Sequence, residues 1–341
     1  MNALKNMKKT TRSNLITYGI VVVFYIVVQA LTVGGVLNNS MKGMLVPICC
    51  YVCMSVSLNL TVGVLGELSL GHAGFMSVGA FSGAVFWVVT GSEMPSVLGF
   101  ALSMLIGGVV AGVFGFLIGI PVLRLRGDYL AIVTLACGEI IKTIINNLSV
   151  TGGAKGLDTS DIYADSRTLL PFAIVLIFLV VLVMMNLKNS RHGRAIMAIR
   201  DNRIAAESNG VNVTYYKLMV VVLAAFFAGM AGVLYGHTLA NIKPAMFDYN
   251  MSIEILVIVV LGGMGSIRGS IIATIILRAL PEVLRQVADY RMLAYSVLLI
   301  VIMLLNSSPQ FAEWKGRWSL KALLSLGKAR KEKTKKEAAK K

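Results

Sequence analysis

The sequence predicts an all-α fold, a polytopic membrane helical bundle of about ten transmembrane segments, some of them short or broken. Of the 341 residues, 57% are hydrophobic and 14% are charged, whereas soluble domains carry about 25% charged residues. The apolar residues gather in runs close to the roughly 20 residues that a helix needs to cross a bilayer. The runs do not alternate in polarity as barrel strands do. Because backbone groups in lipid must be satisfied internally, we expect each run to be a helix.

Ten such runs follow one another along the chain, and each is a predicted membrane span. The eighth run is short, and the fifth carries polar residues on one face. The first exceeds the roughly 7–15 apolar residues of a secretory signal, so we expect it to be retained as a span. The basic regions 1–14 and 307–341 flank the membrane domain 15–306. The predicted spans are residues 15–37, 43–62, 72–90, 96–120, 129–149, 169–187, 216–238, 251–265, 269–286 and 292–306.

The basic residues predict the orientation of these spans. With the N-terminus inside and the spans alternating, Lys and Arg on inside segments outnumber those on outside segments by roughly four to one. We therefore predict that both termini are cytoplasmic. The net charge of +16 comes from clusters between apolar runs, which favours a topological role and contact with anionic membrane lipid over nucleic-acid binding.

The sequence lacks the motifs of common enzymes. It has no GxxxxGK[ST] loop, so we do not expect it to bind ATP in that way. It has no HExxH or GxSxG motif, no zinc-spaced Cys and His pattern, and three histidines that are far apart. We therefore predict no catalytic, metal or cofactor site in this chain.

Two glycine-rich interruptions, residues 63–74 and 261–269, lie between predicted spans. Glycine destabilises a helix by about 1 kcal/mol relative to alanine, and paired helix interruptions in the two halves of a transporter indicate its pathway. Small residues at these places also suit tight helix packing. We expect the two interruptions to lie close together beside a translocation route. The candidate residues are Gly66, Glu67, Ser69, Gly71, His72, Gly262, Gly263 and Ser266.

Ionisable side chains within the spans form a second group of candidates. Glu139 and Lys142 are spaced i, i+3, and Arg278 and Glu282 are spaced i, i+4, so either pair can form on one helix face. Charged groups are costly in lipid and usually face the bundle interior or a wet cavity. Each pair is therefore either structural or part of a pathway, and Thr134 and Glu139 are the pathway candidates on the fifth span.

The long inside segment, about residues 188–215, has the pattern of a short amphipathic helix. Arg203 and Glu207 are spaced i, i+4, and Gly210 is suited to end the helix. Such a helix either docks on a soluble partner or lies in the membrane interface as a connector. Its apolar stripe consists of Ala195, Ile196, Ile199, Ala205 and Ala206.

Four stretches together resemble the LivM-type permease subunits of branched-chain amino acid ABC importers, and the resemblance covers about residues 40–306. They occur in the expected order and on the expected sides of the membrane. The stretches are residues 66–81 (GELSLGHAGFMSVGAF), 126–141 (RGDYLAIVTLACGEII), 193–211 (GRAIMAIRDNRIAAESNGV) and 261–270 (LGGMGSIRGS).

This resemblance implies a heteromeric complex in a bacterial inner membrane. A LivM-type chain pairs with a LivH-type permease, two cytoplasmic ATPase subunits use ATP and Mg, and an extracytoplasmic binding protein delivers the substrate. Residues 205–210 resemble the coupling loop that such permeases insert into the ATPase, with the order Ala-Ala-Glu where importers often have Glu-Ala-Ala. The coupling-loop candidates are Arg200, Asp201, Arg203, Ala205, Ala206, Glu207 and Gly210.

The leading prediction is therefore the permease subunit of an ATP-driven importer of branched-chain amino acids. The family also includes carriers of urea and amides, and nothing in the spans selects a leucine side chain, so import of another small solute is one alternative. A second alternative is an autonomous secondary transporter or channel that uses the buried Glu and Lys residues. A membrane-embedded enzyme lacks any candidate nucleophile, base or metal cluster.

Overall fold

Helices make up nearly all of the described structure. The computed structural model describes residues 17–24, 26, 28–29, 39–90, 96–125, 127–160, 166–283, 296–297, 300 and 304. The chain divides into two units, Met1–Ala279 and Leu280–Lys341, and every contact described below lies within the first. The predicted basic ends and most of the first and last predicted spans fall outside the described residues.

Ten α-helices with residue-level bounds follow one another in the described part of the chain. They are α2 (Asn39–Asn59), α3 (His72–Thr90), α4 (Ser96–Val122), α5 (Asp128–Asn147), α6 (Ser166–Asn189), α7 (Arg191–Asp201), α8 (Arg203–Ser208), α9 (Val213–Gly236), α10 (Tyr249–Gly262) and α11 (Ile267–Val283). A π-helix, η2 (Leu60–Leu65), continues α2, and the 3₁₀ turns are η4 (Ser149–Thr151), η5 (Gly153–Lys155) and η6 (Pro244–Met246).

Six helical stretches of the described residues are long and apolar enough to cross a membrane. They match the second, third, fourth, sixth, seventh and eighth predicted spans, and α5 and α11 occupy the fifth and ninth. The prediction of a polytopic helical membrane protein is thereby confirmed. The six stretches are Met41–Leu65, His72–Thr90, Val97–Val122, Thr168–Asn189, Val213–Gly236 and Pro244–Gly262.

Helix α2 runs through the interior of the bundle. Its apolar stretch is fully buried, and it packs against α6, α9 and α10. Cys49, Cys50 and Cys53 are buried free thiols, which pack there as small apolar side chains. Deeper along the helix, the hydroxyl of Ser55 lies 2.7 Å from that of Thr274 on α11. Hydrogen bonding of this kind is what buried polar groups require.

Helices α3, α4 and α9 approach one another closely because glycines line their contacts. A Cβ built on Gly79 of α3 would overlap the backbone of Gly229 on α9, and one built on Gly107 of α4 would lie 2.8 Å from the carbonyl oxygen of Gly79. Close backbone approach through small residues is typical of membrane helices. The other face of α4 exposes apolar side chains such as Leu105 and Val113, which suits contact with lipid.

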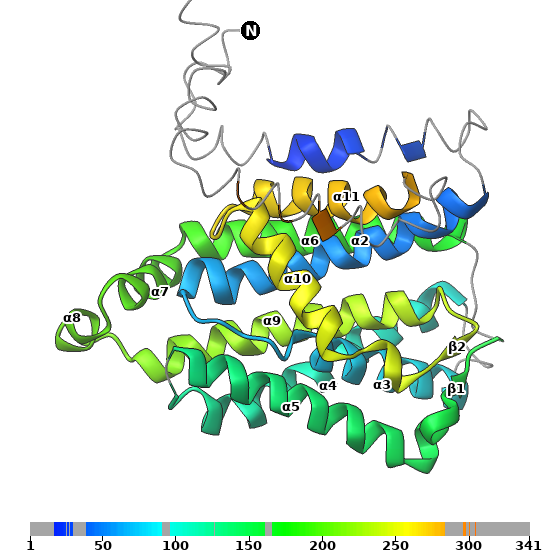
Figure 1. The fold of residues 1–341 in the computed structure, drawn as a ribbon, viewed down its shortest axis with the longest axis horizontal. Coiled ribbons are helices and arrows are strands. Elements are labelled where there is room, and N and C mark those ends of the chain that lie inside the picture. The colour runs from blue at the N-terminus through cyan, green and yellow to red at the C-terminus, as the bar shows by residue number, and fades with distance from the viewer. Residues whose placement is uncertain are drawn as a thin grey trace, which may run out of the picture. The chain divides into compact units, whose positions relative to one another are not determined.

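Two short strands, which the sequence did not predict, join the loop after α5 to the loop after α9. They are β1 (Leu157–Asp158) and β2 (Asn241–Ile242), which pair antiparallel. Figure 1 shows the strands at one end of the bundle and α7 and α8 at the other. The sequence placed these two regions on opposite sides of the membrane, and the structure places them at opposite ends of the helices.

Candidate functional site

The first glycine-rich interruption begins inside a helix. α2 continues as the π-helix η2, which ends where Gly66 takes a left-handed conformation with φ +81°. Only residues 66–71 are non-helical, so the gap is shorter than the predicted 63–74. π-Helical turns frequently occur at functional sites, which makes this turn a first point of interest.

The second interruption is a tight turn between α10 and α11. Gly263 and Gly265 have φ values of +92° and +78°, which glycine adopts without steric cost. A Cβ on Gly262 would lie 2.7 Å from the carbonyl oxygen of Gly269, so the chain folds back on itself with no room for a side chain. The hydroxyl of Ser266 accepts a hydrogen bond from the Gly269 amide (3.2 Å). These contacts account for Gly262, Gly263 and Ser266 as parts of a turn.

The two interruptions touch, and we call residues 59–71 and 262–270 together the glycine junction. A Cβ on Gly63 would overlap the backbone nitrogen of Gly265. That nitrogen donates a hydrogen bond to the side-chain oxygen of Asn59 (2.7 Å). The side-chain amide nitrogen of Asn59 in turn donates to a serine hydroxyl on α11 (2.8 Å). The expected proximity of the two interruptions is therefore observed, and their part in transport stays a prediction.

Basic side chains from the end of α6 and from α7 reach into the glycine junction. Arg200 on α7 donates from Nη1 to the carbonyl oxygen of Gly63 (3.1 Å). Lys188, at the end of α6, donates to the carbonyl oxygen of Gly265. From the sequence, Lys188 served only as a marker of orientation, and Arg200 was a coupling-loop candidate with no predicted partner at this junction. Their partners are backbone carbonyls of distant segments, which leave no signal in the sequence.

A third basic side chain, Lys217 of α9, forms an ion pair with Glu67. The Lys217 side chain is 4% exposed and the Glu67 side chain 16%. The other carboxylate oxygen of Glu67 is buried without a hydrogen-bond partner. Removing either partner of such a pair leaves an uncompensated buried charge, so this pair fixes residues 66–71 to the start of α9.

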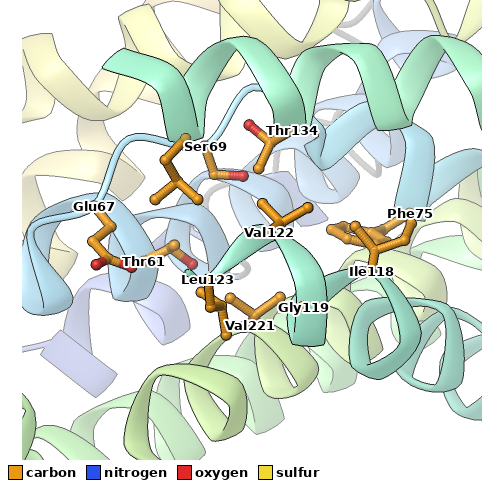
Figure 2. A pocket seen from close by; sticks show the side chains of 11 residues that line it. Thr61, Glu67, Ser69, Phe75, Ile118, Gly119, Val122, Leu123, Thr134 and Val221 are labelled. Carbon is orange, nitrogen blue, oxygen red and sulfur yellow. The ribbon is translucent and has the colours of Figure 1, made fainter. Parts of the chain in front are cut away.

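A small cavity of about 30 Å³ lies beside Glu67. Figure 2 shows Glu67 and Thr61 at one side of it and Ser69 and Thr134 at another. Its volume suits one or two water molecules and is too small for an amino acid. Its lining consists of Thr61, Glu67, Ser69, Phe75, Ile118, Gly119, Val122, Leu123, Leu130, Thr134 and Val221.

His72 and Gly71, two of the pathway candidates, make close packing contacts in the structure, and their part in transport stays a prediction. His72 is 2% exposed, and its Nε2 lies 2.8 Å from Ser57 Oγ. Because Ser57 donates its proton to a backbone carbonyl, His72 donates to Ser57. A Cβ on Gly71 would lie 2.5 Å from the carbonyl oxygen of Thr134, so the first interruption packs directly on α5.

Helix α5 carries a polar face that the rest of the described chain leaves partly exposed. Glu139 and Lys142 form the predicted ion pair (2.5 Å), with side chains 34% and 24% exposed. Glu139 also accepts a hydrogen bond from the Tyr249 amide at the start of α10 (3.1 Å). Thr143 and Asn147 follow on the same face and are exposed. This face runs opposite the buried side of α5.

Arg278 forms an ion pair with a residue on another helix, which the sequence analysis did not predict. It donates to Glu254 of α10 (2.9 Å), and its guanidinium lies 3.3 Å from the ring centroid of Tyr51 on α2. The side chain of Glu282, the expected partner, is outside the described residues. Helical spacing identifies partners on the same helix and gives no information about partners on another, so Glu254 could not be predicted in this way, and the pair of Arg278 with Glu282 stays a prediction.

The segment between α6 and α9 forms two helices instead of the one predicted. Asn202 is extended (φ −156°, ψ 105°) and its side chain accepts a hydrogen bond from the Ala205 amide (3.1 Å). It thus ends α7 and caps α8, as asparagine commonly does at a helix start. Gly210, with φ +80°, then ends α8 through a hydrogen bond from the Val211 amide to the Ala206 carbonyl.

The coupling-loop candidates differ in exposure. Arg203 and Glu207 form the expected i, i+4 ion pair (2.9 Å), and Arg200 pairs with Asp201 (3.1 Å). Ala205 is exposed, whereas Ala206 is 4% exposed and packs within its own chain. The exposed residues of α8 also include Ile204, at 78%. Ile204 was not predicted from the sequence, because the apolar stripe was assigned to the alanines that follow it.

These features define a class, a multi-pass helical membrane protein with interior ion pairs and a helical segment that extends from one end of the bundle. The chain belongs to the family described as "Branched-chain amino acid transport system / permease component", which matches residues 40–307.

Several curated proteins are similar to this chain. It is 36% identical over 285 residues to the high-affinity branched-chain amino acid transport system permease protein LivM of Escherichia coli (strain K12), and 35% identical over 285 residues to the Salmonella typhimurium protein of that name. Each match covers 74% of this chain and 66% of the relative, just under two thirds of its length. It is also 25% identical over 268 residues to the ribose import permease protein RbsC of Haemophilus influenzae, covering 74% of this chain and 80% of the relative. No solved structure matches the chain significantly.

Proposed function

We propose that this chain is the permease subunit of an ATP-driven importer of the branched-chain amino acids leucine, isoleucine and valine. The observation that carries the proposal is the family match over residues 40–307, supported by two LivM relatives at 35% and 36% identity. The sequence has no phosphate-binding loop, so hydrolysis of ATP with Mg belongs to partner ATPase subunits. The positive-inside excess orients both termini and α8 toward the cytoplasm.

The docking surface for an ATPase subunit is α8. Its side chains Ile204 and Ala205 are exposed. They do not pack on the bundle, although α8 lies next to it and directly follows α7. A large apolar side chain on a short polar helix suits burial against a partner. Gly210 is also open, since a Cβ there would meet nothing within 4 Å. Ala206 supports α8 from within and is not itself a contact.

The translocation route follows the polar face of α5, against a second permease subunit of the LivH type. Ionised side chains avoid lipid and face aqueous cavities, so Glu139 and Lys142 favour water on this face. An amino acid carries one positive and one negative group, and the ion pair can exchange partners with both without a net change of charge. An extracytoplasmic binding protein would deliver the substrate at the end of the bundle that bears β1 and β2.

Reconstitution of the complete complex in vesicles tests the function. With binding protein and ATP, the wild-type complex should accumulate leucine, and the permease chain alone should not do so under a proton or sodium gradient. The variant Glu139→Gln keeps an oxygen acceptor for the Tyr249 amide and removes the charge, so it should assemble normally and import less leucine. Accumulation by the lone chain would instead make it a secondary transporter.

A second substrate class is favoured by one specific observation, the similarity to a ribose import permease over 74% of this chain. The same reconstitution separates the two classes. Uptake of ribose, urea or an amide in place of leucine would retain the ATP-driven mechanism and change only the solute. The ion pair on α5 argues for the amino acid, because a neutral sugar makes no use of two opposite charges.

A further inference from the structure

The Arg200 side chain connects α7 to the glycine junction. Its Nη1 donates to the Gly63 carbonyl oxygen (3.1 Å). Its aliphatic part covers Gly66, where a Cβ would lie 2.5 Å from Arg200 Cγ. The same guanidinium pairs with Asp201 on its solvent side. Arg200 therefore spans from the exposed surface of α7 to the end of η2.

The carbonyl that Arg200 binds belongs to a helix end. The last carbonyls of a helix have no partner within the helix and need one elsewhere. Gly63 lies in the final turn of η2, next to Gly265 of the second interruption. Hydrogen bonds to charged donors are stronger than neutral ones, so Arg200 is a firm attachment for this turn.

From Gly66 the chain leads directly to α5. The Leu70 amide donates to Thr134 Oγ1 (3.0 Å), and a Cβ on Gly74 would lie 2.9 Å from the Cα of Gly138. Close-packed contacts of this kind transmit displacements. The cavity beside Glu67 (Figure 2) lies along this path and leaves the side chains there some freedom to shift.

We propose that Arg200 is the positioning residue through which movement of α7 and α8 reaches the polar face of α5. The proposal rests on the proposed function, in which α8 docks on an ATPase subunit. The buried pair of Lys217 with Glu67 holds the opposite flank of residues 63–71. The partly exposed Arg200 makes a direct hydrogen bond from α7 to η2, and it belongs to the helix that leads into the docking surface.

The test compares Arg200→Met with Arg194→Met in the complete reconstituted complex. Methionine keeps the aliphatic part over Gly66 and removes the donor. Arg194 is exposed on the same helix and lies outside both the docking surface and the contacts to the junction described here, so its variant is a matched control. Because a hydrogen bond to a charged group is worth about tenfold or more, Arg200→Met should import about tenfold less leucine per ATP hydrolysed, and Arg194→Met should match wild type.

Cysteine labelling on α5 measures whether the movement reaches that helix, independently of which substrate is transported. Ala136 is exposed, and Ala136→Cys, with Cys137→Ser to remove the neighbouring thiol, reports access to this face. Labelling should change on addition of ATP in the wild-type background and stay unchanged with Arg200→Met. Normal import per ATP together with a normal ATP response in Arg200→Met overturns the proposal. Absence of an ATP response in the wild-type background overturns the proposed function itself.

If Arg200→Met fails to assemble, a double variant tests the proposal instead. A Cβ on Gly66 would lie 3.5 Å from the Arg200 Cβ, within the range of a disulfide. Gly66→Cys with Arg200→Cys replaces the attachment by a reversible covalent one, and because a side chain at φ +81° is strained in both the oxidised and the reduced form, comparison of the two forms cancels that strain. Oxidation should raise leucine import per ATP several-fold over the reduced form, which has lost the guanidinium contact. Equal coupling in the oxidised and reduced forms overturns the proposal.

Discussion

Two neighbouring helices, α7 and α8, are separated by the single residue Asn202 and differ in how they relate to the rest of the chain. α7 buries Ile196 and Ile199, which are 0% and 5% exposed. α8 exposes Ile204 at 78%. The same residue type thus anchors one helix to the bundle and is presented to solvent by the other.

The difference shows that one amphipathic segment can serve both to attach to the bundle and to bind a partner. A single helix over the whole segment would turn its stripe toward one surface. The extended backbone at Asn202 reorients the chain, so α7 holds the segment on the bundle and α8 is free to bind. Arg200, at the end of α7, lies at the boundary and contacts the glycine junction.

The largest expected effect comes from matched isoleucine substitutions in the two helices. Ile196→Ala should lower the stability of the chain by about 2–5 kcal/mol, because it removes a fully buried side chain. Ile204→Ala should change it by less than about 0.5 kcal/mol, since the side chain is exposed. Thermal unfolding of the purified protein in detergent measures both. Equal losses of stability would show that α8 is an anchor like α7.

The next effect concerns binding instead of folding. Ile204→Ala should weaken assembly with the ATPase subunit by about 1–3 kcal/mol, the range of a buried apolar interface residue. Co-purification at limiting ATPase concentration measures the change. Gly210→Ala serves as a comparison, because φ +80° disfavours alanine and the variant perturbs the end of α8 without removing an apolar contact. Full-strength assembly of Ile204→Ala would place the docking surface elsewhere.

Local patterns in the sequence predicted much of this molecule. The apolar runs located α2, α3, α4, α6, α9 and α10, because helix length and bilayer thickness are linked. The structure also contains the two ion pairs that helical spacing predicted, Glu139 with Lys142 and Arg203 with Glu207. Each of these features depends only on residues within a few positions of one another.

Contacts between distant segments could not be predicted in this way. Arg278 pairs with Glu254 on another helix, and Lys217 pairs with Glu67 across 150 positions. Periodicity says which side of a helix is polar and does not say what lies opposite. The break at Asn202 did carry a local signal, since asparagine favours helix starts, but the apolar stripe around it pointed to one continuous helix.

A smaller effect is expected at the boundary residue itself. Asn202→Ala removes the hydrogen bond to the Ala205 amide and should cost α8 about 1 kcal/mol. Hydrogen exchange of the amides in 203–208 should therefore be about fivefold faster, with unfolding of the whole chain unchanged. Asn202→Asp keeps an oxygen acceptor and is the control. A loss of global stability with Asn202→Ala would mean that α7 and α8 fold as one unit.

The smallest effect separates a surface ion pair from an anchoring one. Arg203 and Glu207 have side chains 31% and 48% exposed, and exposed pairs spaced i, i+4 contribute about 0.3–0.5 kcal/mol. Glu207→Gln should therefore leave the midpoint of thermal unfolding nearly unchanged in the isolated chain. If α8 is a presented helix, any effect of this variant appears only in the assembled complex and weakens as salt is added. A clear, salt-independent loss of stability in the isolated chain would show that the pair is held within the fold. In that case the contrast between α7 and α8 would disappear, because both helices would be anchors.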